Sequence, residues 1–87
     1  MKFTVSHYKK ANSALFVNGG RLTVTDTEYV LKCLFWTVAR FSIDNVYIHR
    51  IPNCAFFNGI RIVGKTGSFD LYFYPSTAKR LFALLKL

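Results

Sequence analysis

The fold is decided by residues 18–34, which read Asn-Gly-Gly-Arg-Leu-Thr-Val-Thr-Asp-Thr-Glu-Tyr-Val-Leu-Lys-Cys-Leu. Gly19 and Gly20 can adopt a positive φ without the steric penalty of a Cβ atom, as a tight hairpin turn requires. After them, Leu22 and Val24 alternate with polar residues, which is the period of a half-buried strand. The stretch therefore predicts a hairpin turn followed by a strand.

A second strand follows at once. Asp26 and Thr27 can end the first strand, because such side chains bond to nearby backbone groups in turns. Tyr29, Leu31 and Cys33 then form an inward-facing row over residues 28–34. We therefore predict an antiparallel meander that contains both strands.

This block resembles the opening of the GRAM and pleckstrin-homology-like family. Bacterial members of that family carry a Gly-Gly-basic-Leu-x-Leu/Val-Thr-Asp/Asn turn, and residues 19–26 match the pattern. Residues 11–12, Ala-Asn, stand where the family often has this pair, and residues 41–46 fit its later bend without the usual proline. The resemblance covers residues 11–87. It implies a mainly β, PH-like (GRAM-type) barrel of two roughly orthogonal antiparallel sheets, with about seven strands and one C-terminal α-helix.

The length of 87 residues indicates a single domain over residues 1–87, in which residues 1–12 are the hardest to assign. Residues 3–6 alternate as a short strand, and residues 7–10 are consistent with a loop or a helical turn. The seven main strands are predicted within residues 13–74, at residues 13–17, 21–25, 28–34, 38–42, 45–51, 60–63 and 69–74. Turns are expected at residues 35–37 and 64–67, and a loop is expected to begin at Pro52.

The period changes after Pro75. Ala78, Leu81, Phe82 and Leu85 lie at i, i+3, i+4 and i+7, which is one face of a helix. We predict this helix over residues 76–87, with Ser76 as its N-cap and its apolar face closing the sheet core.

The composition indicates a folded domain that is attracted to anionic partners. The chain is 52% hydrophobic and 17% aromatic, which argues against disorder. Twelve Lys and Arg against four Asp and Glu give a net charge of +8, which favours anionic lipid headgroups, nucleic acid or acidic protein surfaces. The alternative is that this charge only keeps an apolar domain in solution.

We expect a cytoplasmic protein that is peripheral at the membrane. The first residues lack the apolar region of a signal peptide. The longest apolar stretch, residues 30–39, is interrupted by Lys32 and Thr37 and is shorter than the roughly 20 residues that span a bilayer. Cys33 and Cys54 are expected to be free thiols.

No catalytic residue, metal ligand or cofactor site is predicted. His7 and His49 lie in unrelated segments without the partners that nucleophilic catalysis needs. The two cysteines lack metal-ligand spacing, and residues 64–67 are too short for a phosphate-binding loop. The sequence therefore predicts a binding module and not an enzyme.

Basic residues are the main candidate site. Those that could bind an anion or a lipid are Lys9, Lys10, Arg21, Lys32, Lys79 and Arg80. In phosphoinositide-binding PH domains, basic residues on the first two strands hold headgroup phosphates, and Arg21 and Lys32 fall in comparable regions. The loop at residues 18–20 is too short to wrap a headgroup, which favours weak, salt-sensitive attraction to anionic membranes. Lys79 and Arg80 lie near a helix N-terminus that could hold an anion, or they form a solvated basic face.

Aromatic residues give a second set of candidates. Trp36, Phe56 and Phe57 lie in predicted turns and loops. With the turn residue Phe35 and the outward residues Val30 and Leu34, they could join two subunits of a symmetric homo-oligomer. The alternative function is a small basic nucleic-acid-binding barrel. Its stacking and phosphate-binding residues would be Phe56, Phe57, Tyr72, Tyr74, Arg61 and Lys65.

Overall fold

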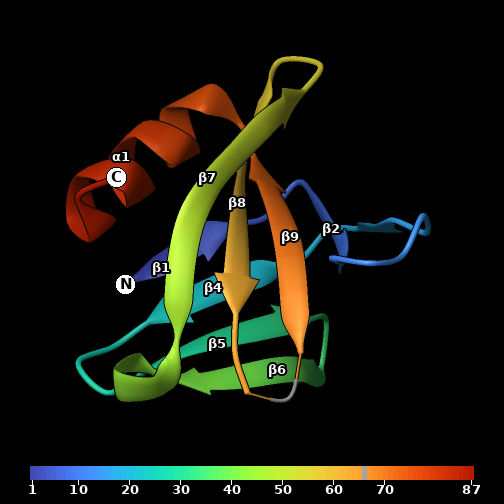
Figure 1. Cartoon of the computed structure of the whole chain (residues 1–87). Helices are drawn as coiled ribbons and strands as arrows, with labels where there is room; N and C mark the ends of the chain where they lie inside the picture. Colours follow the sequence, from blue (N-terminus) through green and yellow to red (C-terminus); the bar gives the residue numbers. More distant parts are fainter. Residues whose placement is uncertain (66) are drawn as a thin grey trace.

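The computed structural model describes residues 1–65 and 67–87 and consists of two antiparallel sheets and one C-terminal helix (Figure 1). The elements are β1 (Lys2–Thr4), β2 (His7–Lys10), β3 (Val17–Asn18), β4 (Arg21–Val24), β5 (Glu28–Cys33), β6 (Trp36–Ser42), the 3-10 helix η1 (Ile43–Asn45), β7 (Tyr47–Cys54), β8 (Phe57–Val63), β9 (Ser68–Phe73) and α1 (Pro75–Leu85). Sheet A has the strand order β1-β4-β5-β6, and sheet B has the order β3-β2-β9-β8-β7. The predicted class, two antiparallel sheets with a C-terminal helix, is confirmed.

The first part of the chain forms one long ribbon that belongs to both sheets. β1 pairs with β4 and β2 pairs with β3 in a single continuous register. At the corner between the sheets, the Val5 N–H donates to the Gly20 carbonyl (3.0 Å) and the Gly19 N–H donates to the Ser6 carbonyl (2.8 Å). If β1 with β2 and β3 with β4 are each counted as one bent strand, the described chain has seven strands.

Gly19 and Gly20 lie at this corner and not in a hairpin turn. Their φ values of +83° and +143° confirm the predicted positive φ. The strands on either side, β3 and β4, pair with other strands and not with each other, so the predicted hairpin is wrong. A Cβ on Gly20 would lie 3.3 Å from the Lys32 carbonyl oxygen, so the corner needs glycine for close approach as well as for φ.

Two predicted assignments within the ribbon are also wrong. Residues 7–10 form strand β2 instead of a loop or helical turn, and the strand predicted at residues 13–17 is reduced to β3. Tyr8 is buried, whereas Leu15 is 80% exposed. The reason is long-range pairing, because β2 is held against β9, which is distant in sequence.

Turns differ from the prediction at two further places. Leu34 and Phe35 form the turn after β5, so β6 begins at Trp36 instead of residue 38. Pro52 lies inside β7, which tolerates it because β7 is an edge strand of sheet B. The predicted turn at residues 64–67 includes residue 66, which lies outside the described residues.

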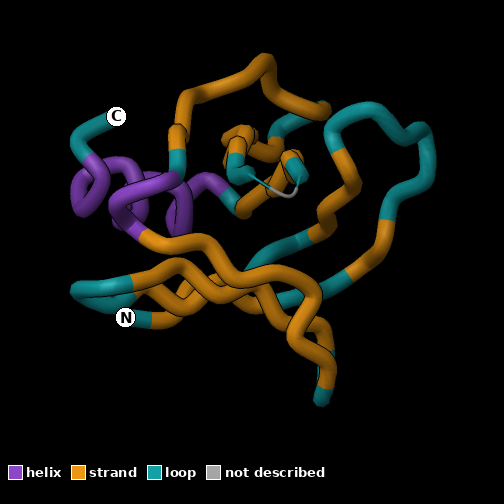
Figure 2. Tube along the Cα trace, turned by 60° about the horizontal axis from the view of Figure 1, so that its bottom comes forward, coloured by secondary structure: helices purple, strands orange, loops and turns teal. Residues whose placement is uncertain are grey.

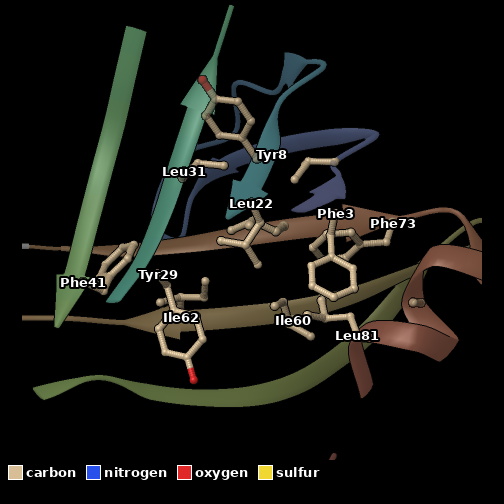
Figure 3. Packing of buried hydrophobic residues seen from close by; sticks show 13 residues of the cluster. Phe3, Tyr8, Leu22, Tyr29, Leu31, Phe41, Ile60, Ile62, Phe73 and Leu81 are labelled. Carbon is tan, nitrogen blue, oxygen red and sulfur yellow. The ribbon is translucent and has the colours of Figure 1, made fainter. Parts of the chain in front are cut away.

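The core lies between the sheets. Figure 3 shows Leu22 and Leu31 of sheet A packed toward Ile60 and Ile62 of sheet B, and all four side chains are fully buried. At one end, α1 covers this core on the predicted face. Its inward residues are the buried Ala78 and Leu81 and the partly buried Phe82 and Leu85.

The start of the helix differs by a residue or two from the prediction. Pro75 occupies the first turn and Tyr74 is the N-cap, so Ser76 does not cap the helix. Proline suits this position because the first helical N–H groups have no partner within the helix and its φ is already close to the helical value.

The sheets are joined at the ribbon corner and are open on the side away from it. Figure 2 shows the two strand layers, with α1 at one end. β6 ends sheet A and β7 ends sheet B, and in the described part of the chain these two strands do not pair. In the described part of the chain the two sheets therefore do not form a closed barrel, and β6 keeps one free edge.

Candidate functional site

Two of the predicted basic residues meet on the outer face of sheet A. Arg21 on β4 and Lys32 on β5 are directly opposite each other, and both are exposed. They line a shallow hollow of about 230 Å³ together with Thr4, Gly20 and Leu34. Like charges directly opposite on neighbouring strands repel, so an anion bound between them would stabilise the pair.

The turn beside this pair carries three exposed apolar side chains in succession. Leu34, Phe35 and Trp36, which we call the β5–β6 tip, are 86%, 97% and 75% exposed. The turn lies at the end of the hairpin that is away from α1 (Figure 1). Leu34 also has a positive φ of 55°, a conformation that a non-glycine residue rarely adopts. The tip thus places apolar surface in solvent next to two cations.

The other predicted cations lie elsewhere. Lys10 is exposed at the end of β2, and Lys79 and Arg80 are exposed on α1. The Arg80 guanidinium lies 5.3 Å from the ring centroid of the buried Phe3. The structure therefore groups Arg21 with Lys32 and does not bring Lys10, Lys79 or Arg80 into the same hollow.

Lys9 is engaged within the fold. Its ammonium group lies 3.4 Å from Asp70 and donates to the carbonyls of Ala11 (3.2 Å) and Ser13 (2.9 Å). Asp70 is only 2% exposed and also accepts two bonds from Arg61, at 2.7 and 3.0 Å. Hydrogen bonding to Asp70, reinforced by its charge, raises the pKa of Arg61. This network ties β2, β9 and β8 together, and the sequence pattern gave no signal for it.

The outer face of sheet B carries an aromatic cluster, whose members are His7, Phe16, Phe56, Phe57, Tyr72 and Tyr74. The His7 ring stacks on Tyr72, with centroids 4.9 Å apart and planes at 9°. Phe57 packs edge-on against His7 (5.0 Å) and Tyr74 (5.1 Å). Sequence reasoning found Phe56 and Phe57 as exposed candidates but missed that β2 supplies the centre of the cluster.

Burial within this cluster changes two titrations. Burial lowers the pKa of His7 and raises the pKa of Tyr72. Tyr72 is 7% exposed, whereas Phe56 and Tyr74 are 61% and 46% exposed. Only the rim of the cluster therefore offers surface to a partner.

One residue predicted to join subunits is not available. Val30 lies on the outer face of sheet A, between Thr23 and Arg40 of the neighbouring strands, and is only 6% exposed. The prediction that Val30 presents an exposed side chain is therefore wrong. Strand alternation predicts on which face of the sheet Val30 lies, but not how far the neighbouring side chains bury it.

Among the described residues there is no group of three or more His, Cys, Asp or Glu placed to hold a metal ion. Cys33 and Cys54 are free thiols. In the described part of the chain, no helix has the length and apolar character needed to cross a bilayer.

No protein-family model matches this chain, and no curated protein or solved structure matches it. The resemblance to GRAM and pleckstrin-homology-like domains therefore rests on the sequence pattern quoted above.

Proposed function

We propose that this domain is a non-catalytic, peripheral membrane-binding module of the GRAM and pleckstrin-homology-like kind, which attaches to anionic bilayers through the β5–β6 tip. One observation carries the proposal: the exposed Leu34, Phe35 and Trp36 stand beside the cross-strand cations Arg21 and Lys32. An apolar element that enters the interface and a basic patch that meets the headgroups are two signals that together give stable reversible attachment.

The apolar side chains of the tip are not buried in the fold, so their burial in a membrane would add to the free energy of binding. Full burial of a leucine or phenylalanine side chain contributes about 1.5–3 kcal/mol. Tryptophan is enriched at the membrane–water interface, where its ring is apolar and its N–H can still bond to polar groups. Because Leu34, Phe35 and Trp36 are exposed already, inserting them requires no unfolding of the domain.

The basic patch supplies the preference for anionic lipid. A lysine or arginine close to an anionic membrane contributes about 1 kcal/mol, and this attraction fades beyond a Debye length of about 10 Å at 0.1 M salt. Arg21 and Lys32 lie at the base of the tip, where headgroups would surround them. The net charge of +8 adds attraction at longer range, so binding is expected to weaken as salt is added.

Vesicle sedimentation with a matched pair of variants tests the proposal. Wild-type protein should sediment with phosphatidylserine-containing vesicles at low salt and much less with pure phosphatidylcholine vesicles. Phe35→Ser should weaken binding by about tenfold or more, because it removes the most exposed apolar side chain of the tip. Phe56→Ser is the control, since Phe56 is an exposed aromatic on another hairpin.

The outcome that would contradict the proposal is equal binding by the two variants, or no sedimentation of the wild type with either lipid. A mobility-shift assay with a single-stranded oligonucleotide belongs beside it. Tyr72 is buried and Arg61 is paired with Asp70, so we expect little shift. A strong shift without vesicle binding would favour the nucleic-acid alternative.

A further inference from the structure

The free edge of β6 carries backbone N–H and C=O groups that point away from β5. The Ile43 N–H donates to the Thr27 carbonyl (3.0 Å), which fixes the alternation of hydrogen-bonded pairs between β5 and β6. By this alternation, Phe41 bonds to β5, whereas the N–H and C=O groups of Arg40 and Ser42 point away from it. In the described part of the chain, no strand pairs with that side of β6.

A groove follows this edge. One hollow of about 600 Å³ lies between residues 38–40 of β6 and residues 10–12 and 67–69. A second, of about 160 Å³, lies between residues 40–42 and residues 45 and 64–65. Both hollows are lined by Arg40, so together they extend along β6 at the opening between the two sheets.

The groove has a basic rim and an apolar lining. Among the described residues, the charged ones that line it are Lys10, Arg40 and Lys65. Arg40 is held by Glu28 at 3.0 Å, which leaves Lys10 and Lys65 as the cations to be matched. Val38, Ala39 and Phe69 supply the apolar part of the lining.

We propose that this groove binds an extended acidic peptide segment of a partner protein, which adds to the free edge of β6 as a new strand of sheet A. The peptide backbone would pair with Arg40 and Ser42, as strand addition to a sheet edge requires. Its carboxylates would meet Lys10 and Lys65, and its apolar side chains would reach the Phe69 end of the groove. This inference is independent of the proposed membrane function.

Ser42 offers a substitution that removes one edge donor and leaves the fold intact. Its φ is −67°, which is the value that proline imposes, and its N–H faces the groove and not β5. Ser42→Pro therefore deletes a backbone donor for the incoming strand. Ser42→Ala is the matched control, because it removes the same hydroxyl and keeps the N–H.

The probe is a peptide of alternating glutamate and valine with blocked ends, as long as the seven residues of β6. In an NMR titration it should shift the amide signals of residues 38–42. Ser42→Pro should weaken binding by about tenfold and Ser42→Ala should leave it unchanged. Lys10→Glu should also weaken it, and Phe35→Ser should not. Thermal melts of the variants establish that each is folded.

Three results would overturn the proposal. They are no amide shift at millimolar peptide, equal affinity of the two Ser42 variants, and equal binding of a lysine–valine peptide of the same pattern. Displacement of the peptide by inositol trisphosphate, with an affinity that Ser42→Pro leaves unchanged, would assign the groove to a small anion instead of a strand.

Discussion

Two hairpins of this molecule have similar turn sequences and different surroundings. The turn after β5 reads Cys-Leu-Phe-Trp (residues 33–36), and the turn after β7 reads Cys-Ala-Phe-Phe (residues 54–57). In each, the first central residue has a positive φ, 55° at Leu34 and 53° at Ala55. Phe57 packs against His7 and Tyr74, whereas Trp36 is 75% exposed. The same local turn is thus part of the fold in one place and a free apolar tip in the other.

The largest expected effect is on the free energy of unfolding, which should depend on one hairpin and not on the other. Phe57→Ala should lower the free energy of unfolding by about 2 kcal/mol, below the roughly 3–5 kcal/mol of a fully buried phenylalanine, because Phe57 is only partly buried. Trp36→Ala should change it by less than about 0.5 kcal/mol, as for other exposed sites. Urea denaturation measures both. An equal loss in the two variants would mean that the β5–β6 tip also supports the fold.

Charge reversal beside the β5–β6 tip tests whether the tip binds anionic membranes. Arg21→Glu or Lys32→Glu should each weaken binding to phosphatidylserine vesicles by about tenfold at low salt, because reversal removes one attraction of about 1 kcal/mol and adds a repulsion. Lys79→Glu, on the exposed face of α1, makes the same change in net charge away from the tip. If Lys79→Glu weakened binding as much, net charge alone would account for the attraction.

Glycine at the strained position of each turn should give a smaller effect. Leu34→Gly and Ala55→Gly relieve a conformation that costs a non-glycine residue about 1–2 kcal/mol, and they lose part of this gain because glycine is more flexible when unfolded. We expect a net stabilisation of about 0.5 kcal/mol in each, measured by thermal melts. Only Leu34→Gly should also weaken vesicle binding. An equal loss of vesicle binding in Ala55→Gly would show that the two turns do not differ in this respect.

The smallest effect concerns pH and the cluster that holds the second hairpin. Burial lowers the pKa of His7 below its ordinary value of 6.5, so in the acid range the unfolded chain binds more protons than the folded one. His7 therefore leaves stability unchanged above about pH 6.5 and lowers it as the pH falls below that value. Denaturation at about pH 8 and about pH 5 should show this loss, and His7→Gln should reduce it. An unchanged slope in the variant would assign the loss to other groups.

Local patterns predicted much of this fold, but not its pairing. Alternation found β4 and β5, and the helical period found the inward face of α1. The demand for positive φ at Gly19 and Gly20 was also correct. A bend between two sheets and a hairpin turn both require positive φ. Only the pairing partners of β3 and β4 show which of the two structures is formed.

The candidate site was only partly predictable, because its geometry also depends on strand pairing. Arg21 and Lys32 were candidates from the sequence, yet their direct pairing depends on the register of β4 against β5. Lys9 was a candidate as well, but Asp70, which lies far along the chain, holds it. The exposure of Trp36 and the partial burial of Phe57 follow from what packs beside each hairpin, and no local pattern contains that information.

Membrane attachment through the β5–β6 tip is tested most directly with Trp36, which is the single tryptophan of the chain. Its fluorescence should shift to shorter wavelength when phosphatidylserine-containing vesicles are added at low salt, because the indole leaves water for the interface. The shift should be reversed by salt and much reduced in Arg21→Glu. Vesicle binding with no change in Trp36 emission or in its quenching by acrylamide would show that the β5–β6 tip stays in water, and would contradict the proposed mode of attachment.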